Sequence, residues 1–141
     1  MEAIEAALRD GRSGIEMLAD ACRIMQQLPG YTGVYIYALE GETLVLKAFS
    51  GRATEHIHIA AGTGICGASV QLRAPIVVAD VGSDPRYLAC NLETKSEIVY
   101  PILRGETYLA QIDVDSDDRA AFGADDEAFL ERVAGRLEPL F

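Results

Sequence analysis

Two strand-like segments joined by a turn occupy residues 96–115, which read SEIVYPILRGETYLAQIDVD. β-branched and aromatic residues are frequent in 96–103 and in 107–115, as is typical of strands, and Gly105 lies in the turn. Earlier in the chain, similar patterns predict strands at 31–37, 43–49, 56–60 and 75–79. We therefore expect an antiparallel sheet whose strands are mostly joined by hairpins.

Helices are expected at the two ends of the chain. Apolar residues within 4–25 recur at intervals of three, four and seven, and Pro29-Gly30 ends that segment. After Phe122-Gly123, a second apolar stripe begins with the acidic residues 125–127, which suit the positive end of a helix dipole. Together these elements predict an α/β layered fold of the α+β type. Its antiparallel sheet carries the N- and C-terminal helices, and residues 1–141 form a single domain.

The composition is that of an ordinary acidic globular protein. The formal net charge is −10 and the pI is about 4.5, so nucleic acid and anionic membranes are poor partners. No apolar stretch approaches the roughly 20 residues that span a bilayer, and the acidic N-terminus does not resemble a signal peptide. The three cysteines are an odd number at wide spacing, which argues against a secreted disulfide framework. We expect a cytoplasmic protein with reduced thiols.

Three carboxylates in the paired segments form a candidate site. Side chains alternate along a strand, so Asp113 and Asp115 share one face. If the two strands pair with Glu97 on that same face, all three carboxylates converge. The alternative is that these residues form an ordinary solvated face of the sheet, which the alternating pattern alone would favour.

The cysteines differ in their surroundings. Cys22 lies on the apolar stripe of the first helix and is interpreted as a small buried hydrophobe. Cys66 and Cys90 lie in loops or at element ends. Cys66 stands where a glycine-rich turn opens a helix, and the N-terminus of that helix should favour its thiolate. Buried, inert thiols are the alternative for both. His56 and His58 lie near Cys66 in sequence, but no metal-ligand spacing supports them, so we interpret them as surface residues and expect no metal.

Two motif-like patterns are set aside. Residues 62–67, GTGICG, match the dinucleotide pattern G-x-G-x-x-G, but the helix expected at 68–73 is too short for a parallel crossover. These glycines are interpreted as turn formers. Residues 113–117, DVDSD, resemble the start of a calcium loop, but its glycine and glutamate positions hold Asp118 and Ala124.

Short motifs in a fixed order resemble one known family. They are Gly64-Ile65-Cys66-Gly67, Leu88-Ala89-Cys90, Ser96-Glu97-Ile98-Val99, Ile112-Asp113-Val114-Asp115-Ser116 and Phe122-Gly123. Together they resemble the free methionine-(R)-sulfoxide reductases, over about residues 31–137. Members of that family have a GAF-type fold, a sheet with helices packed against it, so the resemblance implies this fold here.

The resemblance also implies roles for individual residues. Cys90 corresponds to the nucleophile, Cys66 to the resolving thiol, and Tyr31 to an aromatic wall of the pocket. The carboxylates that would hold the substrate are Glu97, Asp113 and Asp115. The chain departs from the family at His56, where members often carry a further cysteine, and at Tyr87, where they often carry histidine.

The activity implied is reduction of free L-methionine (R)-S-oxide through a cysteine sulfenic acid and a disulfide. No cofactor is expected, and a thioredoxin-like dithiol would restore the enzyme. One alternative is a GAF-type sensor that binds a small molecule without catalysis. Another is a homodimerisation domain that uses the two terminal helices.

Overall fold

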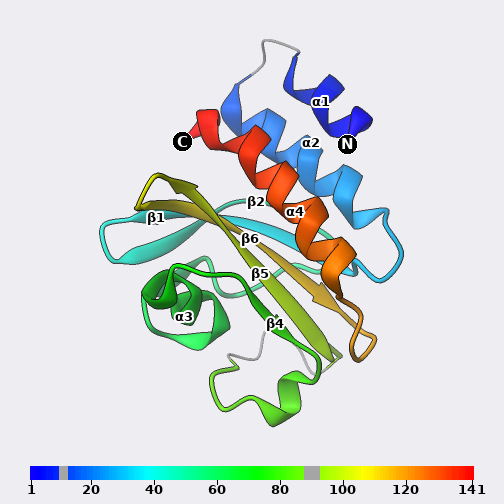
Figure 1. Cartoon of the computed structure of the whole chain (residues 1–141), viewed down its shortest axis with the longest axis vertical. Helices are drawn as coiled ribbons and strands as arrows, with labels where there is room; N and C mark the ends of the chain where they lie inside the picture. Colours follow the sequence, from blue (N-terminus) through cyan, green and yellow to red (C-terminus); the bar gives the residue numbers. More distant parts are fainter. Residues whose placement is uncertain (10–12, 88–92) are drawn as a thin grey trace.

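The computed structural model describes residues 1–9, 13–87 and 93–141 of the chain (Figure 1). Its centre is a six-stranded sheet in the order β3-β2-β1-β6-β5-β4, and each neighbouring pair of strands is antiparallel. The strands are β1 (Gly33–Glu40), β2 (Thr43–Ser50), β3 (His58–Ala60), β4 (Ile76–Val78), β5 (Ser96–Arg104) and β6 (Thr107–Ser116). The antiparallel sheet predicted from sequence is confirmed.

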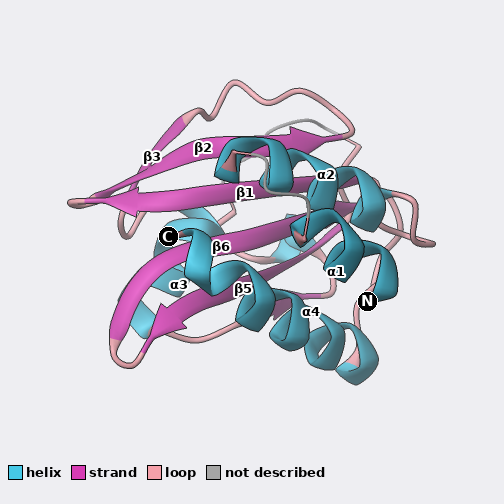
Figure 2. Ribbon diagram, turned by 90° about the horizontal axis from the view of Figure 1, so that it is seen from above, coloured by secondary structure: helices cyan, strands magenta, loops and turns pink. Residues whose placement is uncertain are grey.

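Helices lie on both faces of this sheet. They are α1 (Glu2–Leu8), α2 (Gly14–Gln26), α3 (Gly64–Leu72) and α4 (Ala124–Leu137). The terminal helices α1, α2 and α4 cover one face, and α3 lies behind the sheet on the other (Figures 1 and 2). None of the helices in the described ranges is long and apolar enough to cross a membrane.

The short helix expected at residues 68–73 begins earlier than predicted. α3 starts at Gly64, directly after Thr63, whose backbone is extended. The two glycines at 64 and 67 lower helix propensity, which is why the pattern alone did not extend the helix over them. As a result, Cys66 lies inside the first turn of α3.

The face covered by the terminal helices is an apolar core. Alternate residues of β1 and β6 point into it, including Val34, Ile36, Ile112 and Val114, all with no exposed surface. Leu130 and Val133 of α4 and Met25 of α2 pack against them. Cys22 belongs to the same cluster, which confirms the interpretation of a buried hydrophobe.

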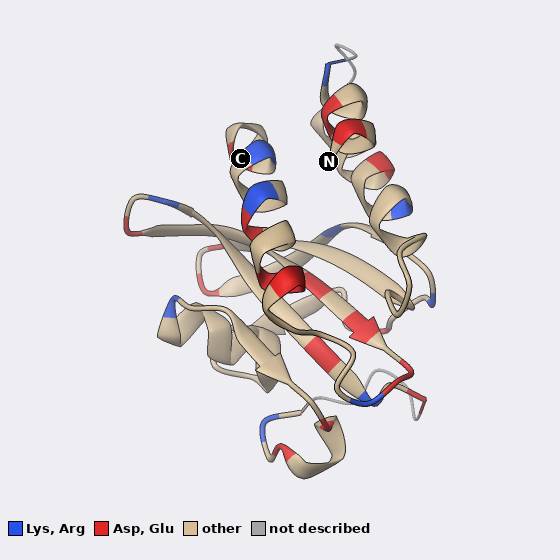
Figure 3. Ribbon diagram, turned by 45° about the vertical axis from the view of Figure 1, so that its right-hand side comes forward, with Lys and Arg blue, Asp and Glu red and all other residues tan. Residues whose placement is uncertain are grey.

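The opposite face carries a second core with a different composition. Here Tyr35, Tyr37 and Val99 pack with Ile65 and Cys66 of α3. Acidic positions lie along β5 and β6 within this otherwise uncharged part of the sheet (Figure 3). Cys66, one of the candidate site residues, belongs to this second core, so the candidate site is on the α3 face.

Candidate active site

The pairing of β5 with β6 brings the three carboxylates together. Glu97 is paired with Asp115, and Val99 with Asp113, so Glu97 and both aspartates share one face. Their exposed fractions are only 5%, 4% and 5% for Glu97, Asp113 and Asp115. The predicted convergence is confirmed, and the alternative of a solvated sheet face is wrong.

The thiol of Cys66 joins these acids. Its Sγ donates a hydrogen bond to Glu97 Oε2 at 3.9 Å. The Cys66 sulfur and one carboxylate oxygen from each of Glu97 and Asp113 lie within 4.8 Å of one another. Helix α3 and the β5–β6 hairpin, which are distant from each other in sequence, thus contribute to one buried cluster.

Close packing of α3 positions Cys66. A side chain at Gly67 would lie 2.7 Å from the backbone nitrogen of Gly62 and 2.8 Å from the carbonyl oxygen of Ala60, so the helix can approach the turn only because Gly67 has no Cβ. On the sheet side, Gln111 Nε2 donates a hydrogen bond to the Cys66 carbonyl oxygen at 3.1 Å. Of the glycines interpreted as turn formers, Gly62 lies in the turn before α3, whereas Gly64 and Gly67 lie within the helix, so the interpretation is wrong for those two.

A cavity opens next to the cluster. It is lined by Tyr37, His56, Ile59, Thr63, Gly64, Ile65, Cys66, Glu97 and Asp113. Tyr37 donates its hydroxyl hydrogen to the carbonyl oxygen of His56 at 2.8 Å, which links β1 to the segment before β3. The interpretation of both histidines as surface residues is wrong for the half-buried His56, whereas His58 is exposed. Strand alternation could have indicated that Tyr37 lies at the site. It shares a sheet face with Tyr35, and Tyr35 pairs with Asp113.

Burial governs the protonation of the acids. The pKa of Asp115 is raised well above its ordinary value, first by burial and then by the neighbouring Asp113 charge. Burial also raises the pKa of Asp113, although hydrogen bonds from Glu97, Cys66 and Asp115 act in the opposite direction. Burial and the neighbouring charge therefore favour the protonated form of these carboxyls.

The environment of Cys66 opposes ionisation of its thiol. Burial raises the pKa of Cys66 well above its ordinary value, and the charges of Asp113, Glu97 and Asp115 raise it further. The prediction that the helix N-terminus favours a Cys66 thiolate is therefore wrong. Loss of hydration and three nearby acids outweigh the helix dipole.

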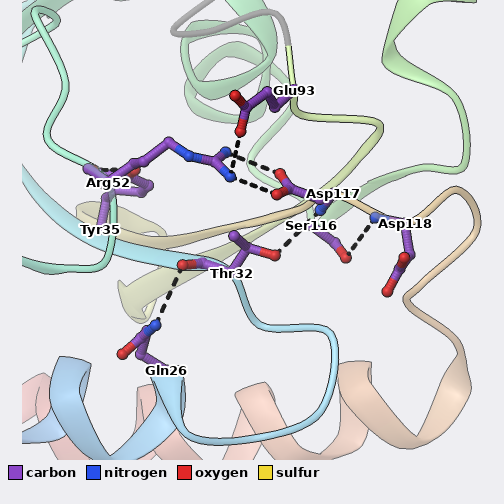
Figure 4. Close-up of polar contacts among 8 residues, drawn as sticks. All are labelled: Gln26, Thr32, Tyr35, Arg52, Glu93, Ser116, Asp117 and Asp118. Carbon is purple, nitrogen blue, oxygen red and sulfur yellow. Dashed lines mark hydrogen bonds and ion pairs between the residues drawn. The ribbon is translucent and has the colours of Figure 1, made fainter.

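Arg52 is a charged neighbour of the site that the sequence reasoning missed. Its guanidinium donates to Asp117 Oδ1 at 2.9 Å and to Glu93 Oε2 at 2.7 Å (Figure 4). Its charge also lowers the pKa of Asp115. Thus the end of β2, the end of β6 and the segment before β5 meet at one cation.

Two other cations lie in the segment between β4 and β5. Of these, Arg86 is engaged locally, because its Nη2 lies 2.7 Å from Asp84 Oδ2 on the surface. Lys95 is close enough for its charge to lower the pKa of Asp117. Arg52 could not be identified from its neighbours in sequence, because its partners Glu93 and Asp117 are distant in the chain.

Tyr31 does not lie among the residues that line the cavity. Its ring packs against Phe122 and Phe129 in the helix-side core, with ring centres 5.6 and 6.4 Å away. Its hydroxyl donates a hydrogen bond to Asp126 Oδ1 at 2.8 Å. Among the described residues, Tyr37 is the tyrosine that lines the cavity. Cys90, the predicted nucleophile, lies outside the described residues.

A fold with helices on both faces of an antiparallel sheet and a buried cavity under α3 defines a known class. The GAF domain family matches residues 13–138 of the chain. The chain therefore belongs to the GAF domain family, and the fold class predicted from sequence is confirmed.

Relatives define the family more narrowly. The free methionine-R-sulfoxide reductase of Saccharomyces cerevisiae is 39% identical over 107 residues, which are 74% of this chain and 58% of the yeast protein. The matched region thus spans less than two thirds of that relative's length. A type II free methionine-R-sulfoxide reductase from Thermoplasma acidophilum superposes with a TM-score of 0.85 at 37% identity, covering 98% of this chain and 94% of the other.

A third similar structure is the free methionine-R-sulfoxide reductase from Neisseria meningitidis in complex with its substrate. It has a TM-score of 0.91 and 29% identity, and the match covers 98% of this chain and 83% of that one. Within the GAF domains, the chain belongs to the family of the free methionine-R-sulfoxide reductases.

Proposed function

We propose that this protein reduces free L-methionine (R)-S-oxide to methionine. One observation carries the proposal: the thiol of Cys66 and the carboxylates of Glu97 and Asp113 meet in a buried cavity, with Asp115 beside them. Membership of the reductase family supports the same conclusion. The cluster supplies what the reaction needs, namely a sulfur that can be oxidised and acids that can bind a cation and move protons.

The carboxylates suit a free amino acid as substrate. An ionised member of the Glu97, Asp113 and Asp115 group would bind the ammonium group of methionine sulfoxide, because buried opposite charges attract strongly. A methionine inside a peptide has no such ammonium group. Preference for the free amino acid follows from this charge pairing.

In the first chemical step, the Cys90 thiolate attacks the sulfur of the sulfoxide. The sulfoxide oxygen must be protonated to leave, and a carboxyl with a raised pKa, such as Asp113 or Asp115, is suited to donate that proton. This attack forms a bond between the two sulfurs, and the oxygen leaves as water once it has taken up two protons. A water molecule then attacks the Cys90 sulfur and breaks the sulfur–sulfur bond, which releases one proton and methionine with its sulfur reduced by two electrons. Cys90 keeps the hydroxyl group of that water as a sulfenic acid.

In the second step, Cys66 resolves the sulfenic acid. The sulfur of Cys66 forms a bond to the Cys90 sulfur, and the hydroxyl group leaves as water after it takes up a proton. Glu97 already accepts the hydrogen bond of the Cys66 thiol, so it is placed to take the thiol proton as the bond forms. A thioredoxin-like dithiol then reduces the disulfide, and no cofactor takes part.

The proposal is tested by assaying the free R-sulfoxide, with the S-epimer as negative control. Cys90→Ser should abolish turnover, whereas Cys22→Ala, which changes a thiol in the helix-side core, should retain it. Undiminished turnover by Cys90→Ser would contradict the assignment. Mass spectrometry after peroxide treatment provides a second readout, in which a Cys66–Cys90 disulfide that thioredoxin reverses supports the reductase. Inert thiols would instead favour the GAF-type sensor.

Several finer assignments are part of the same proposal. We propose that residues 1–141 form one domain, that the protein acts in the cytoplasm, and that two copies associate through their terminal helices. Size-exclusion chromatography with light scattering tests the last point, and a monomer at assay concentrations would contradict it.

A further inference from the structure

We propose that the cavity at Cys66 is also a binding site for a thiophilic divalent cation such as Zn²⁺. The ligands would be the sulfur of Cys66 and one carboxylate oxygen each from Glu97 and Asp113. This inference rests on the arrangement of the donors and does not depend on the reductase activity.

The spacing of the donor atoms suits a tetrahedral ion. In zinc sites the metal lies about 2.3 Å from sulfur and about 2.0–2.2 Å from carboxylate oxygen, which puts neighbouring ligand atoms roughly 3.5 Å apart. Here Cys66 Sγ and Glu97 Oε2 are 3.9 Å apart, and the three donor atoms lie within 4.8 Å of one another. Small side-chain adjustments would therefore close the site around an ion.

The cluster also has unused acceptor capacity. Asp113 Oδ1 and Asp115 Oδ1 are buried and have no hydrogen-bond partner among the described residues. Asp113 lines the cavity and is only 4% exposed, so its carboxylate can offer an acceptor to a cation held there. Buried acceptors without partners are costly, and a bound cation would relieve that cost. The neighbouring Arg52 is already engaged by Asp117 and Glu93.

The donor chemistry selects the kind of ion. A thiolate is a soft ligand that favours zinc, whereas magnesium and calcium favour six or more oxygen ligands. Three protein ligands leave a fourth tetrahedral position for water or for His56, which lines the same cavity. No ligand spacing in the sequence indicated this site, because its donors come from α3, β5 and β6.

Metal binding would have a consequence for the proposed reaction. A bound ion holds its cysteine ligand as a thiolate and occupies the sulfur. Cys66 would then be unable to form a disulfide, so Zn²⁺ should inhibit turnover wherever the reductase activity is present.

Cobalt offers a direct test with a readout other than activity. The reduced full-length chain is titrated with Co²⁺, whose bond to a thiolate gives a charge-transfer absorption, and Zn²⁺ is then added to displace it. We expect one Co²⁺ per chain. Cys66→Ser should lose the absorption, and Asp113→Asn should weaken affinity on the order of tenfold or more. Cys22→Ala, which changes the thiol in the helix-side core, should bind like the wild type.

The outcomes separate this proposal from the proposed function. Absence of the charge-transfer band, or a band that persists undiminished in Cys66→Ser, would overturn the cation site whatever the enzyme does. Binding by a chain that lacks reductase activity would support the cation site and count only against the proposed function. Thermal unfolding of each variant checks its fold, and if Cys66→Ser fails to fold, the near-isosteric Asp113→Asn decides the question.

Discussion

The two faces of the sheet use the same strands for opposite purposes. On the helix side, Ile112 and Val114 of β6 have no exposed surface and pack among apolar side chains. On the α3 side, Asp113 and Asp115 of the same strand are almost as deeply buried, yet their pKa values are raised by that burial. One face stabilises the fold, and the other carries groups that oppose folding when ionised. Buried charge that costs stability is expected where it serves chemistry or binding.

The largest difference between the faces should appear in activity. Asp113→Asn removes an acid at the cavity while it keeps the size of the side chain, so the proposed turnover should fall by about 10²–10⁴-fold. The free energy of unfolding at neutral pH should stay the same or rise, because a buried carboxyl with a raised pKa is replaced by a neutral amide. Steady-state kinetics on the free R-sulfoxide, combined with urea unfolding, measures both quantities. A variant that loses stability and activity together would break the division between the faces.

The reverse behaviour is expected on the helix side. Leu130→Ala removes a fully buried side chain of α4 and should lower the free energy of unfolding by about 2–5 kcal/mol. Turnover per folded molecule should remain close to that of the wild type, since Leu130 lies across the sheet from the cavity. Chemical denaturation and an assay corrected for the folded fraction check this. A large fall in the corrected rate would show that the two faces are coupled.

The smallest effect should appear in the pH dependence of stability. The pKa of Asp115 is higher in the folded state than in the unfolded chain, so the folded state binds this proton more tightly. Stability from this group is therefore complete below the unfolded pKa of about 3.9 and is lost as the pH rises toward the raised folded pKa.

Asp115→Asn removes that loss. Its stability curve should be flatter than that of the wild type above about pH 4, with a difference in slope of at most about 1.4 kcal/mol per pH unit. Urea unfolding at a series of pH values tests this. Parallel curves for the two proteins would mean that Asp115 ionises as readily in the folded state as in the unfolded chain.

Sequence reasoning succeeded where local periodicity decides structure. Strand alternation placed Asp113 and Asp115 on one face. The pairing of β5 with β6 brings Glu97 to that same face, as the convergence of the three carboxylates required. Sequence reasoning failed where long-range contacts matter. Arg52 follows β2 and meets Asp117 after β6 and Glu93 before β5, and nothing in its neighbouring residues indicates these contacts between distant segments.

Two further errors have physical causes. Tyr31 was expected at the pocket, but it precedes β1 and its ring packs between Phe122 and Phe129 on the other side of the sheet. For Cys66, the helix dipole was given more weight than burial, although desolvation is the larger effect for a thiol with only 6% exposed surface. Exposure is a property of tertiary packing and could not be inferred from the first turn of a helix.

The alternation along β6 has an evolutionary consequence. Because Asp113 lies between Ile112 and Val114 of the opposite core, inserting one residue within this stretch would turn the acidic side chains toward the apolar core and the apolar side chains toward the cavity. Point substitutions at Asp113 or Asp115, by contrast, can change which ligand the site binds. Ile112 and Val114 remain in the apolar core and keep the fold stable. Substitutions on the cavity face could thus convert a catalytic relative into a binding one, or the reverse, while every intermediate sequence still folds.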